Sequence, residues 1–545
     1  MDHDADGQAG VPILAAMPVT QRANGGMASA PHRAGAESAA RVLAEDGTAI
    51  EAALAMAATL CVVYPHMTGL GGDSFWLIAV PGEAPITIDG AGRSGAGVTP
   101  QTYERQGLEA VPWRGPLAAI TVAGAVSAWA AAANINANWG GRLPLSRLFA
   151  DAEALARNGI RVTASHADAL AEFCGELAAQ AGFAALHFLA GEPPREGDVL
   201  HQPALARTFD ALAREGLDGF YRGRLAAQIA AELAQANVPL TADDLAAQRA
   251  KTGAALRVAL PMAEVFNCAP PSQGVASLMI LGIFAQLGVT RADSFEHVHG
   301  LIESTKLAFA VRDREVGHPS PDWPAVERHL GGGALAAASQ RIDPRRAAAW
   351  PGQARGGDTA WFGVIDRKGR AVSAIQSLYF EFGAGIGLPQ SGFVWQNRGC
   401  ALQLGGAGPN VLGPGRQPLH TLNPACARFR DGRTMVYGTQ GGDGQPQTQA
   451  AVFTRYGFFG QDLQEAISAP RWVLGRTWRD DASTVRIESR FSADLVAALA
   501  AAGHRMKRVA ALDPVMGHAG AVVHDPLRGF EGASDPRSDG AAIGH

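Results

Sequence analysis

Two hydroxyl side chains, those of Thr359 and Ser377, are brought together by the spacing of one short stretch. Residues 356–372 read GGDTAWFGVIDRKGRAV, in which a glycine turn presents Thr359 at the start of an apolar run typical of a buried strand. The segment DRKG is a turn, and RAVSAIQS returns as the antiparallel partner. With the turn centred between residues 367 and 368, residue 359 faces about residue 376, which places Ser377 beside Thr359.

This pair of hydroxyl groups allows two interpretations. On this stretch alone, a Thr–Ser pair that hydrogen-bonds across a sheet is the more common arrangement. The alternative is an N-terminal nucleophile, formed by cleavage of the peptide bond between Asp358 and Thr359. Cleavage would give Thr359 a free α-amine with a pKa of about 8, which is a competent general base for the neighbouring hydroxyl.

The elements around this hairpin predict a layered α+β fold. Helical patterns precede it and short strands follow it, without regular βα alternation, which argues against a doubly wound sheet. Gly/Ala/Pro-rich sequence before the hairpin is the expected linker. The predicted segments are helices at 33–63 with a break at EDG, across most of 117–260 and at 295–314, glycine loops leading into strands within 64–95, the linker at 331–357, and strands beyond 359.

Composition and charge narrow the class of protein. The chain has 545 residues, 47% of them hydrophobic and 18% charged, with a net charge of −5. This charge gives no field that would attract nucleic acid or anionic lipid, so we expect neither partner. Five scattered cysteines favour reduced thiols over a disulfide framework. The acidic amino terminus lacks the basic region of a secretory signal, and no stretch reaches membrane-spanning length, so we expect a cytoplasmic protein.

Several segments, taken in order, match the pattern of one enzyme family. They are HRAGAESAARVLAEDGTAIEAALA, TGLGGDSFWLI, TVAGAVSAW, LFADAEALARNGIRVT, APPSQGVASL, HVHGLIESTKLAFAVRDR, DTAWFGVIDRKGRAVSA and GASDPRSDG. From about residue 30 to its end, the chain resembles the γ-glutamyltranspeptidase family of N-terminal nucleophile hydrolases. The resemblance implies a four-layer αββα fold, and it implies neither a cofactor nor a metal.

The same resemblance implies self-cleavage between Asp358 and Thr359. Residues 1–358 would form a large, mostly helical subunit with some core strands, and residues 359–545 a small, strand-rich subunit. The two would share one intertwined core as a heterodimer, and a dimer of heterodimers is compatible with this pattern.

Roles within the site follow from the resemblance, position by position. Thr359 falls on the nucleophile, and Ser377 falls on a second hydroxyl residue that supports it. Gly441 and Gly442, in TQGGDGQPQTQAA, fall on the glycine pair whose N–H groups form the oxyanion hole. Arg93, in IDGAGRSGAG, lies near the arginine that binds the substrate carboxylate.

Departures from the family pattern concern the substrate. Tyr379 replaces a polar Asn, and His420 with Thr421 replaces a Ser–Ser pair. Arg398 and Ala401 stand where residues that hold the α-ammonium group of a γ-glutamyl substrate are expected. Because a cationic Arg398 repels an ammonium group and attracts a carboxylate, these changes disfavour a γ-glutamyl donor. An alternative role for Arg398 is a structural salt bridge, and His420 could instead fill a turn.

The resemblance is strongest to a branch of the family that hydrolyses oxamate, a small carboxylate amide, to oxalate and ammonia in purine degradation. Two other functions stay open. One is γ-glutamyl transfer or hydrolysis, or a related acylase activity. The other is an uncleaved relative that only binds a ligand or partner, which the combination of Thr359, Ser377, Gly441 and Gly442 disfavours.

Two further motifs favour structural roles. His297 and His299 are two residues apart on a predicted helix, where their side chains point apart, and no carboxylate cluster accompanies them in the sequence. The glycine-rich stretches GLGGD and GAGRSGAG lack the pattern of a phosphate-binding loop. We therefore expect no metal site and no nucleotide.

Overall fold

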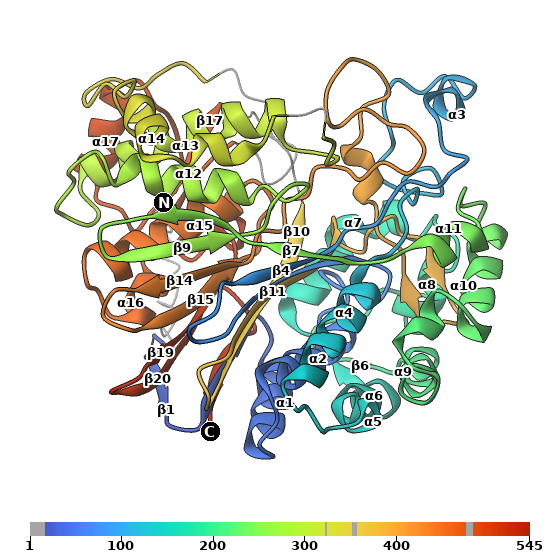
Figure 1. The fold of residues 1–545 in the computed structure, drawn as a ribbon. Coiled ribbons are helices and arrows are strands. Elements are labelled where there is room, and N and C mark those ends of the chain that lie inside the picture. The colour runs from blue at the N-terminus through green and yellow to red at the C-terminus, as the bar shows by residue number, and fades with distance from the viewer. Residues whose placement is uncertain (1–16, 322–323, 351–356, 476–482) are drawn as a thin grey trace, which may run out of the picture.

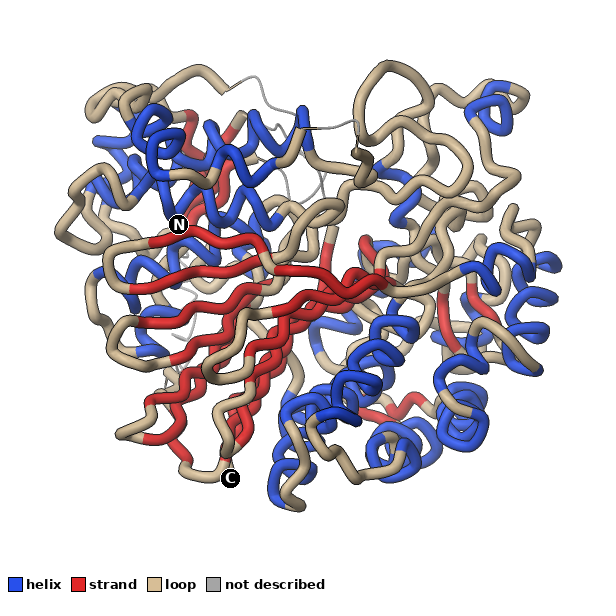
Figure 2. Tube along the Cα trace, in the orientation of Figure 1, coloured by secondary structure: helices blue, strands red, loops and turns tan. Residues whose placement is uncertain are grey.

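Two β-sheets packed face to face form the centre of the molecule, with helices covering both outer faces (Figure 1). The computed structural model describes residues 17–321, 324–350, 357–475 and 483–545. Figure 2 shows the strands running between two bodies of helices. The arrangement has four layers in the order αββα, which confirms the predicted α+β fold class.

Both central sheets have seven strands and are antiparallel throughout. The first sheet has the order β1 (Gln21–Ala23), β20 (Gly529–Ser534), β19 (Ala519–Asp525), β15 (Thr434–Thr439), β14 (Ala425–Phe429), β9 (Ala263–Asn267) and β8 (Leu256–Ala259). The second has the order β21 (Ala541–Gly544), β2 (Gly26–Ala30), β10 (Asp358–Asp366), β11 (Ala371–Tyr379), β3 (Asp73–Ala79), β4 (Ile86–Gly90) and β7 (Lys251–Ala254). Both sheets therefore combine strands from before and after residue 358.

One helical layer covers the second sheet and the other covers the first. Against the second sheet lie α1 (Arg33–Ala44), α2 (Ala49–Val63) and α4 (Ala125–Asn138). The same part of the chain contains α3 (Pro100–Glu104), α5 (Leu145–Leu148), α6 (Ala150–Asn158), α7 (Ala164–Leu177), α8 (Phe183–His187), α9 (Pro203–Glu215), α10 (Arg224–Gln235) and α11 (Ala242–Ala247). Against the first sheet lie α12 (Gly274–Phe284), α15 (Gly444–Phe453) and α16 (Leu463–Ser468), joined by α13 (Phe295–Glu315), α14 (Gly332–Ser339) and α17 (Ala493–Ala501).

Smaller sheets lie outside this core. A three-stranded sheet is formed by β16 (Trp472–Leu474), β17 (Thr484–Glu488) and β18 (Arg505–Val509). Two-stranded pairs are formed by β5 (Ile160–Arg161) with β6 (Val199–Leu200), and by β12 (Gly387–Leu388) with β13 (Phe393–Val394).

The innermost helices are apolar on every face. All residues of α2 and of α12 are buried, which is the position expected of a helix without a polar stripe. The predicted break at EDG is confirmed, because α1 ends at Ala44 and α2 starts after Thr48, whose hydroxyl accepts from the Glu51 N–H as an N-cap. None of the described helices is both long and apolar enough to cross a membrane.

The hairpin of β10 and β11 occupies the middle of the second sheet. Strand β10 pairs with β2 on one side and β11 on the other, and β11 pairs with β3. One face of β10 packs against α2 and the other against β15 and β19. Two covered faces explain why TAWFGVI is apolar throughout instead of alternating.

The prediction of a linker at 331–357 is wrong for residues 332–339. Residues Gly332–Ser339 form α14, which packs against α12 with Leu335 buried. Alanine favours helix strongly enough that a single buried leucine is sufficient to dock the segment. The part of the predicted linker at 351–356 lies outside the described residues.

A row of buried aromatic rings contains four histidines. The ring of His66 lies 4.4 Å from that of Tyr64 and 5.3 Å from that of His166, and His187 lies 6.5 Å beyond His166. The Tyr64 hydroxyl contacts Nδ1 of His518 at 3.1 Å. Burial lowers the pKa of His166 and of His518 to about 4 and that of His187 to about 3, and lowers the pKa of His66 well below its ordinary value. The row is therefore neutral at pH 7.

We expect acid to destabilise the protein through this row. Below pH about 6.5 these histidines bind protons in the unfolded chain but not in the folded chain. For each pH unit of further acidification, each histidine therefore lowers the free energy of unfolding by about 1.4 kcal/mol, until the pH reaches its pKa in the folded protein. Denaturant unfolding at pH 8, 7, 6 and 5 should show a plateau followed by a steep loss. Replacing His187 with Phe should make that loss shallower, whereas His201→Gln, at an exposed histidine, should leave it unchanged. A loss that is equally steep in both variants would contradict the assignment.

Candidate active site

The hairpin register places Thr359 beside Ser377. Ala360 pairs with Gln376, and the ladder shifts by one residue between Asp358 and Ala360, so Thr359 lies at this irregular step next to Ser377. Both hydroxyl side chains are buried. The expected proximity of the two hydroxyl residues is confirmed, because the turn centre read from the sequence is within one residue of the observed one.

A third polar residue continues this row on the neighbouring strand. Asp73, the first residue of β3, pairs directly with Ser377 of β11. Residues that pair across neighbouring strands project from the same face of the sheet. Asp73, Ser377 and Thr359 therefore form a polar row at one end of three adjacent buried strands.

Tyr379 has a strained backbone at the end of β11. Its φ of +84° is uncommon for a residue other than glycine, and its N–H donates to Ser377 Oγ at 2.7 Å. Its ring packs on Gly357, where an added Cβ would lie 2.5 Å from Tyr379 Cε2. The ring also contacts Arg398, whose guanidinium carbon lies 3.8 Å from the ring centroid. Tyr379 thus joins the segment before Thr359 to a buried cation.

The turn at Gly441 and Gly442 reaches Thr359 through a glutamine. Both glycines have positive φ, +112° and +50°, and α15 begins directly after the turn. Gln445, in the first turn of α15, donates its side-chain N–H to Thr359 Oγ1 at 3.3 Å. This contact was not predicted from the sequence, although GGDGQ, a glycine pair followed by an amide at a helix start, contains the signal. The oxyanion role of the glycine N–H groups stays a prediction.

A buried network holds that turn in place. Arg312 of α13 donates to Asp443 at 2.7 Å and to the side-chain oxygen of Gln273 at 3.0 Å. The side-chain nitrogen of Gln273 donates to the carbonyl oxygens of Thr421 at 2.9 Å and Gly442 at 3.0 Å. One glutamine therefore fixes the distance between the glycine turn and the segment that contains Thr421.

Arg398 is a fully buried cation in this group. Its Nε donates to the Leu419 carbonyl at 2.9 Å, its Nη2 donates to the same oxygen, and its Nη1 donates to Thr421 Oγ1 at 3.3 Å. These acceptors are neutral oxygens, and they fix the orientation of the guanidinium. Tyr379, Arg398 and Thr421, three of the residues predicted to bind substrate, are in mutual contact through Arg398.

His420 hydrogen-bonds Asp73. The two residues meet through Nε2 of His420 and Oδ2 of Asp73 at 3.0 Å. Burial, and after it the charge of Arg398, lowers the pKa of His420 well below its ordinary value, so the ring is neutral. Burial also raises the pKa of Asp73 to about 7, against the opposing effect of hydrogen bonds from Gln396, Gly124 and Gly92. In the sequence Asp73 is only the last residue of a glycine loop, and the structure adds it to the site.

Arg93 lies apart from the contacts described above. Its Nη1 donates to the Gly415 carbonyl at 3.0 Å. It lines a separate cavity of about 310 Å³ together with Asp244 and Gln248. Among the described contacts, none joins the Arg93 side chain to Thr359 or Arg398. The predicted binding of a substrate carboxylate by Arg93 stays a prediction.

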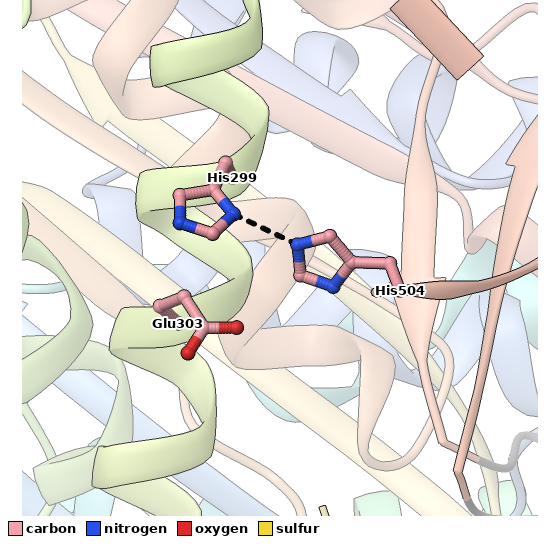
Figure 3. A group of neighbouring side chains, drawn as sticks. All are labelled: His299, Glu303 and His504. Carbon is pink, nitrogen blue, oxygen red and sulfur yellow. Dashed lines mark hydrogen bonds between the residues drawn. The ribbon is translucent and has the colours of Figure 1, made fainter. Parts of the chain in front are cut away.

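One histidine of the HVH motif belongs to a cluster elsewhere in the molecule (Figure 3). His299 and His504 meet through their ring nitrogens at 2.9 Å, and Glu303 lies with them. Glu303 lies four residues after His299 on the same helix face, and it is a single carboxylate, not the carboxylate cluster whose absence was noted in the sequence. Glu303 is paired with the Lys306 ammonium at 2.6 Å, a positive charge that disfavours a bound dication. The His299 Nε2 contacts the Asp343 carbonyl at 2.8 Å. The cluster therefore connects α13 to the segments that contain Asp343 and His504, which is a structural role.

The four-layer fold, with a threonine at the start of a central strand, defines the class of N-terminal nucleophile hydrolases, which act on amide bonds. The sequence model described as gamma-glutamyltranspeptidase matches residues 35–545, and the chain belongs to the γ-glutamyltranspeptidase family.

Individual relatives cover almost the whole chain. The oxamate amidohydrolase proenzyme of Klebsiella pneumoniae is 49% identical over 95% of this chain and 98% of its own. The glutathione hydrolase-like YwrD proenzyme of Bacillus subtilis is 38% identical over the same shares. Among solved structures, cephalosporin acylase from Bacillus halodurans superposes with a TM-score of 0.89 at 29% identity, covering 99% of both chains.

Removing Arg312 should destabilise the protein and disturb the glycine turn. Arg312→Met leaves Asp443 without its buried ion-pair partner at 2.7 Å, which costs about 3–5 kcal/mol. The matched control is Arg314→Met on the same helix, where an exposed ion pair with Glu315 contributes at most about 1 kcal/mol. Denaturant unfolding of both variants compares the two losses directly, and equal losses would contradict the role assigned to Arg312.

Proposed function

We propose that the protein is a self-processing amidohydrolase that converts oxamate and water to oxalate and ammonia. The observation that carries the proposal is the buried Arg398, held against Thr421 and against Tyr379, whose ring packs on Gly357 just before Thr359. A buried guanidinium at this place suits a short substrate that has a carboxylate next to its amide. The relative at 49% identity whose name is oxamate amidohydrolase proenzyme supports this choice.

Self-cleavage at the bond between Asp358 and Thr359 would create the nucleophile. The hydroxyl of Thr359 attacks the preceding carbonyl carbon, and cleavage of the C–N bond frees the α-amine and leaves an ester on the hydroxyl. Water then hydrolyses this ester, which frees the hydroxyl and leaves Asp358 with a carboxylate end. The products are a large subunit of residues 1–358 and a small subunit of residues 359–545. Because both central sheets combine strands of the two segments, the subunits stay together as a heterodimer.

In the proposed hydrolysis, Thr359 Oγ attacks the amide carbon of oxamate and its α-amine takes the proton. The Gly441 and Gly442 N–H groups bind the oxyanion, and Gln445 orients the attacking oxygen from its position at Thr359 Oγ1. The protonated amine then delivers its proton to the leaving nitrogen, which departs as ammonia. Water cleaves the oxalyl ester by the same route in reverse, which releases oxalate and restores the hydroxyl.

The residues around the nucleophile divide into two roles. Ser377 supports Thr359 and holds Tyr379 through its backbone N–H. Arg398, Tyr379, Thr421, His420 and Arg93 are the proposed substrate-binding residues. No cofactor is needed for this chemistry. The five free cysteines suit the reducing cytoplasm. We propose purine degradation as the pathway, which the resemblance to the oxamate branch supports.

The alternative is action on γ-glutamyl groups, as in the glutathione hydrolase proenzyme of Escherichia coli at 28% identity. A γ-glutamyl donor carries an α-ammonium group, and a buried Arg398 repels it. We expect ammonia from oxamate and no p-nitroaniline from a γ-glutamyl anilide. The reverse pattern would overturn the proposed substrate while leaving the family intact.

Substitution of the proposed nucleophile tests the mechanism. Thr359→Ala should give a single full-length band on a denaturing gel and no ammonia release, because neither the attacking hydroxyl nor a new amine terminus exists. Thr359→Ser should still cleave, more slowly, since it keeps a hydroxyl. The wild-type protein should show two fragments whose small member begins at Thr359 by N-terminal sequencing. Cleavage of Thr359→Ala would contradict the assignment.

Gly357 offers a test of how the cleavage site is positioned. A Cβ at residue 357 would lie 2.5 Å from the Tyr379 ring, at a φ of +135° that only glycine adopts easily. Gly357→Ala should therefore slow self-cleavage by about tenfold or more, on the order of a loss of 1.4 kcal/mol or greater in transition-state positioning. Gly333→Ala, a helical glycine whose Cβ meets open space, is the matched control and should cleave at the wild-type rate. Band intensities over time on a denaturing gel measure both.

A further inference from the structure

We propose that Asp73 and His420 form a dyad that makes the substrate site selective for an amide nitrogen over a carboxylate oxygen. The inference rests on the proposed function and adds to it the feature that separates the substrate oxamate from the product oxalate. Both ligands carry a carboxylate that Arg398 attracts. They differ at the other end, where oxamate presents N–H donors and oxalate presents only acceptors.

The hydrogen bonds of Asp73 determine which nitrogen of His420 carries the proton. Oδ1 of Asp73 accepts from the Gly92 N–H at 3.0 Å, the Gly124 N–H at 2.9 Å and the Gln396 side chain at 2.9 Å. Oδ2 faces His420 Nε2 at 3.0 Å. Above the raised pKa of about 7 the carboxylate is ionised, so Oδ2 accepts and His420 donates from Nε2.

The opposite nitrogen of the ring is consequently an acceptor. A neutral imidazole carries one proton, and with that proton on Nε2 the Nδ1 atom presents a lone pair. Within the described residues, Nδ1 of His420 is buried and has no hydrogen-bond partner. A buried acceptor without a donor is costly, and a ligand N–H satisfies it.

Two independent sets of contacts bring His420 to the nucleophile. Along the sheet, Asp73 pairs with Ser377, which lies beside Thr359, and the His420 ring rests on Phe75 of the same strand with centroids 5.0 Å apart.

The second set runs through the loops. The carbonyl of Thr421, the next residue in the chain, shares the side-chain nitrogen of Gln273 with the Gly442 carbonyl, and Gln445 of the adjoining helix contacts Thr359. Both routes therefore connect the dyad to the residues around Thr359 and the glycine turn.

Arg398 and His420 together match the two ends of a carboxylate amide. Arg398 contacts the side chain of Thr421, and its charge acts on His420. A cationic donor and a neutral acceptor in one site complement an anion that bears an N–H group. Oxalate has an oxygen in place of that nitrogen. The lone pairs of this oxygen and of His420 Nδ1 repel each other, which favours release of the product.

Asp73→Asn tests the dyad because it reverses the tautomer of His420. The oxygen of the introduced amide can keep the three donors of Oδ1, while its NH₂ group donates to Nε2 and moves the imidazole proton to Nδ1. We expect KM for oxamate to rise roughly tenfold and the inhibition constant of oxalate to fall by a similar factor. A role in folding alone predicts parallel changes for the two ligands. Unchanged selectivity in an enzyme that self-cleaves normally would overturn the inference.

Two further variants keep the test sharp. Asp89→Asn makes the same substitution at a half-buried carboxyl of β4 that contacts Ala91 and Gln417, and it should leave the oxamate-to-oxalate ratio unchanged. His420→Phe keeps the ring on Phe75 but removes the acceptor, so it should lose affinity for oxamate without the gain for oxalate. If Asp73→Asn fails to fold, retention of oxamate affinity by His420→Phe overturns the inference.

An NMR measurement tests the dyad independently of the proposed substrate. In protein labelled with ¹⁵N-histidine, His420 should show the Nε2–H tautomer, identified by the signals lost in His420→Phe, and Asp73→Asn should show the Nδ1–H tautomer. A wild-type Nδ1–H signal overturns the dyad whatever the substrate is. Absence of ammonia release from oxamate by the wild-type enzyme overturns the proposed function, and the selectivity argument with it, while the tautomer reading still reports on the Asp73–His420 contact.

Discussion

The register of three neighbouring strands, β3, β11 and β10, is the constraint on which the site depends. It aligns Asp73, Ser377 and Thr359 in one row at the end of the second sheet. A slip of one residue in β10 would turn Thr359 to the opposite face of the sheet. Such a slip is prevented because both faces of β10 are covered, one by α2 and the other by β15 and β19 of the first sheet. Its side chains therefore pack in one register only. The irregularity of the β10–β11 ladder lies at the step next to Thr359, where the ladder must open to present the residue.

Burial of charged side chains near this row is costly in free energy, and hydrogen bonds from the surrounding loops offset that cost. Arg398, Asp73 and Arg312 are all buried, and each is surrounded by hydrogen-bond partners that were fixed when the chain folded. The same solution recurs at the C-terminal motif, where Arg471 pairs with Asp535 at 2.6 Å and Arg537 with Glu488 at 2.6 Å. Groups held in this way need little reorganisation when charge develops nearby, which is the main source of electrostatic catalysis. The same buried hydrogen bonds and ion pairs therefore stabilise the loops and preorganise the site.

The sequence predicted those parts of the molecule that depend on short-range pattern. The hairpin turn located Ser377 opposite Thr359, and EDG located the break between α1 and α2. The contacts it did not predict join residues far apart in the chain. Gln445 meets Thr359, and Asp73 meets His420, across separations for which no periodicity gives a distance. The helix α14 was missed because Leu335 is its single buried side chain, a signal that a composition rich in glycine and alanine conceals.

Family membership determines the nucleophile and leaves the substrate to the residues around it. Within one fold, selection between a γ-glutamyl group and a short carboxylate amide is a question of which charges line the same pocket. A carboxylate near the nucleophile would hold an ammonium group, whereas the buried Arg398 and the neutral His420 present a cation and an acceptor. Asp73 connects these two residues, because it hydrogen-bonds His420 and lies within the field of Arg398. Its place at the start of β3 fixes the position of His420 through this hydrogen bond. In the proposed function, the first residue of β3 therefore contributes to specificity together with the arginine.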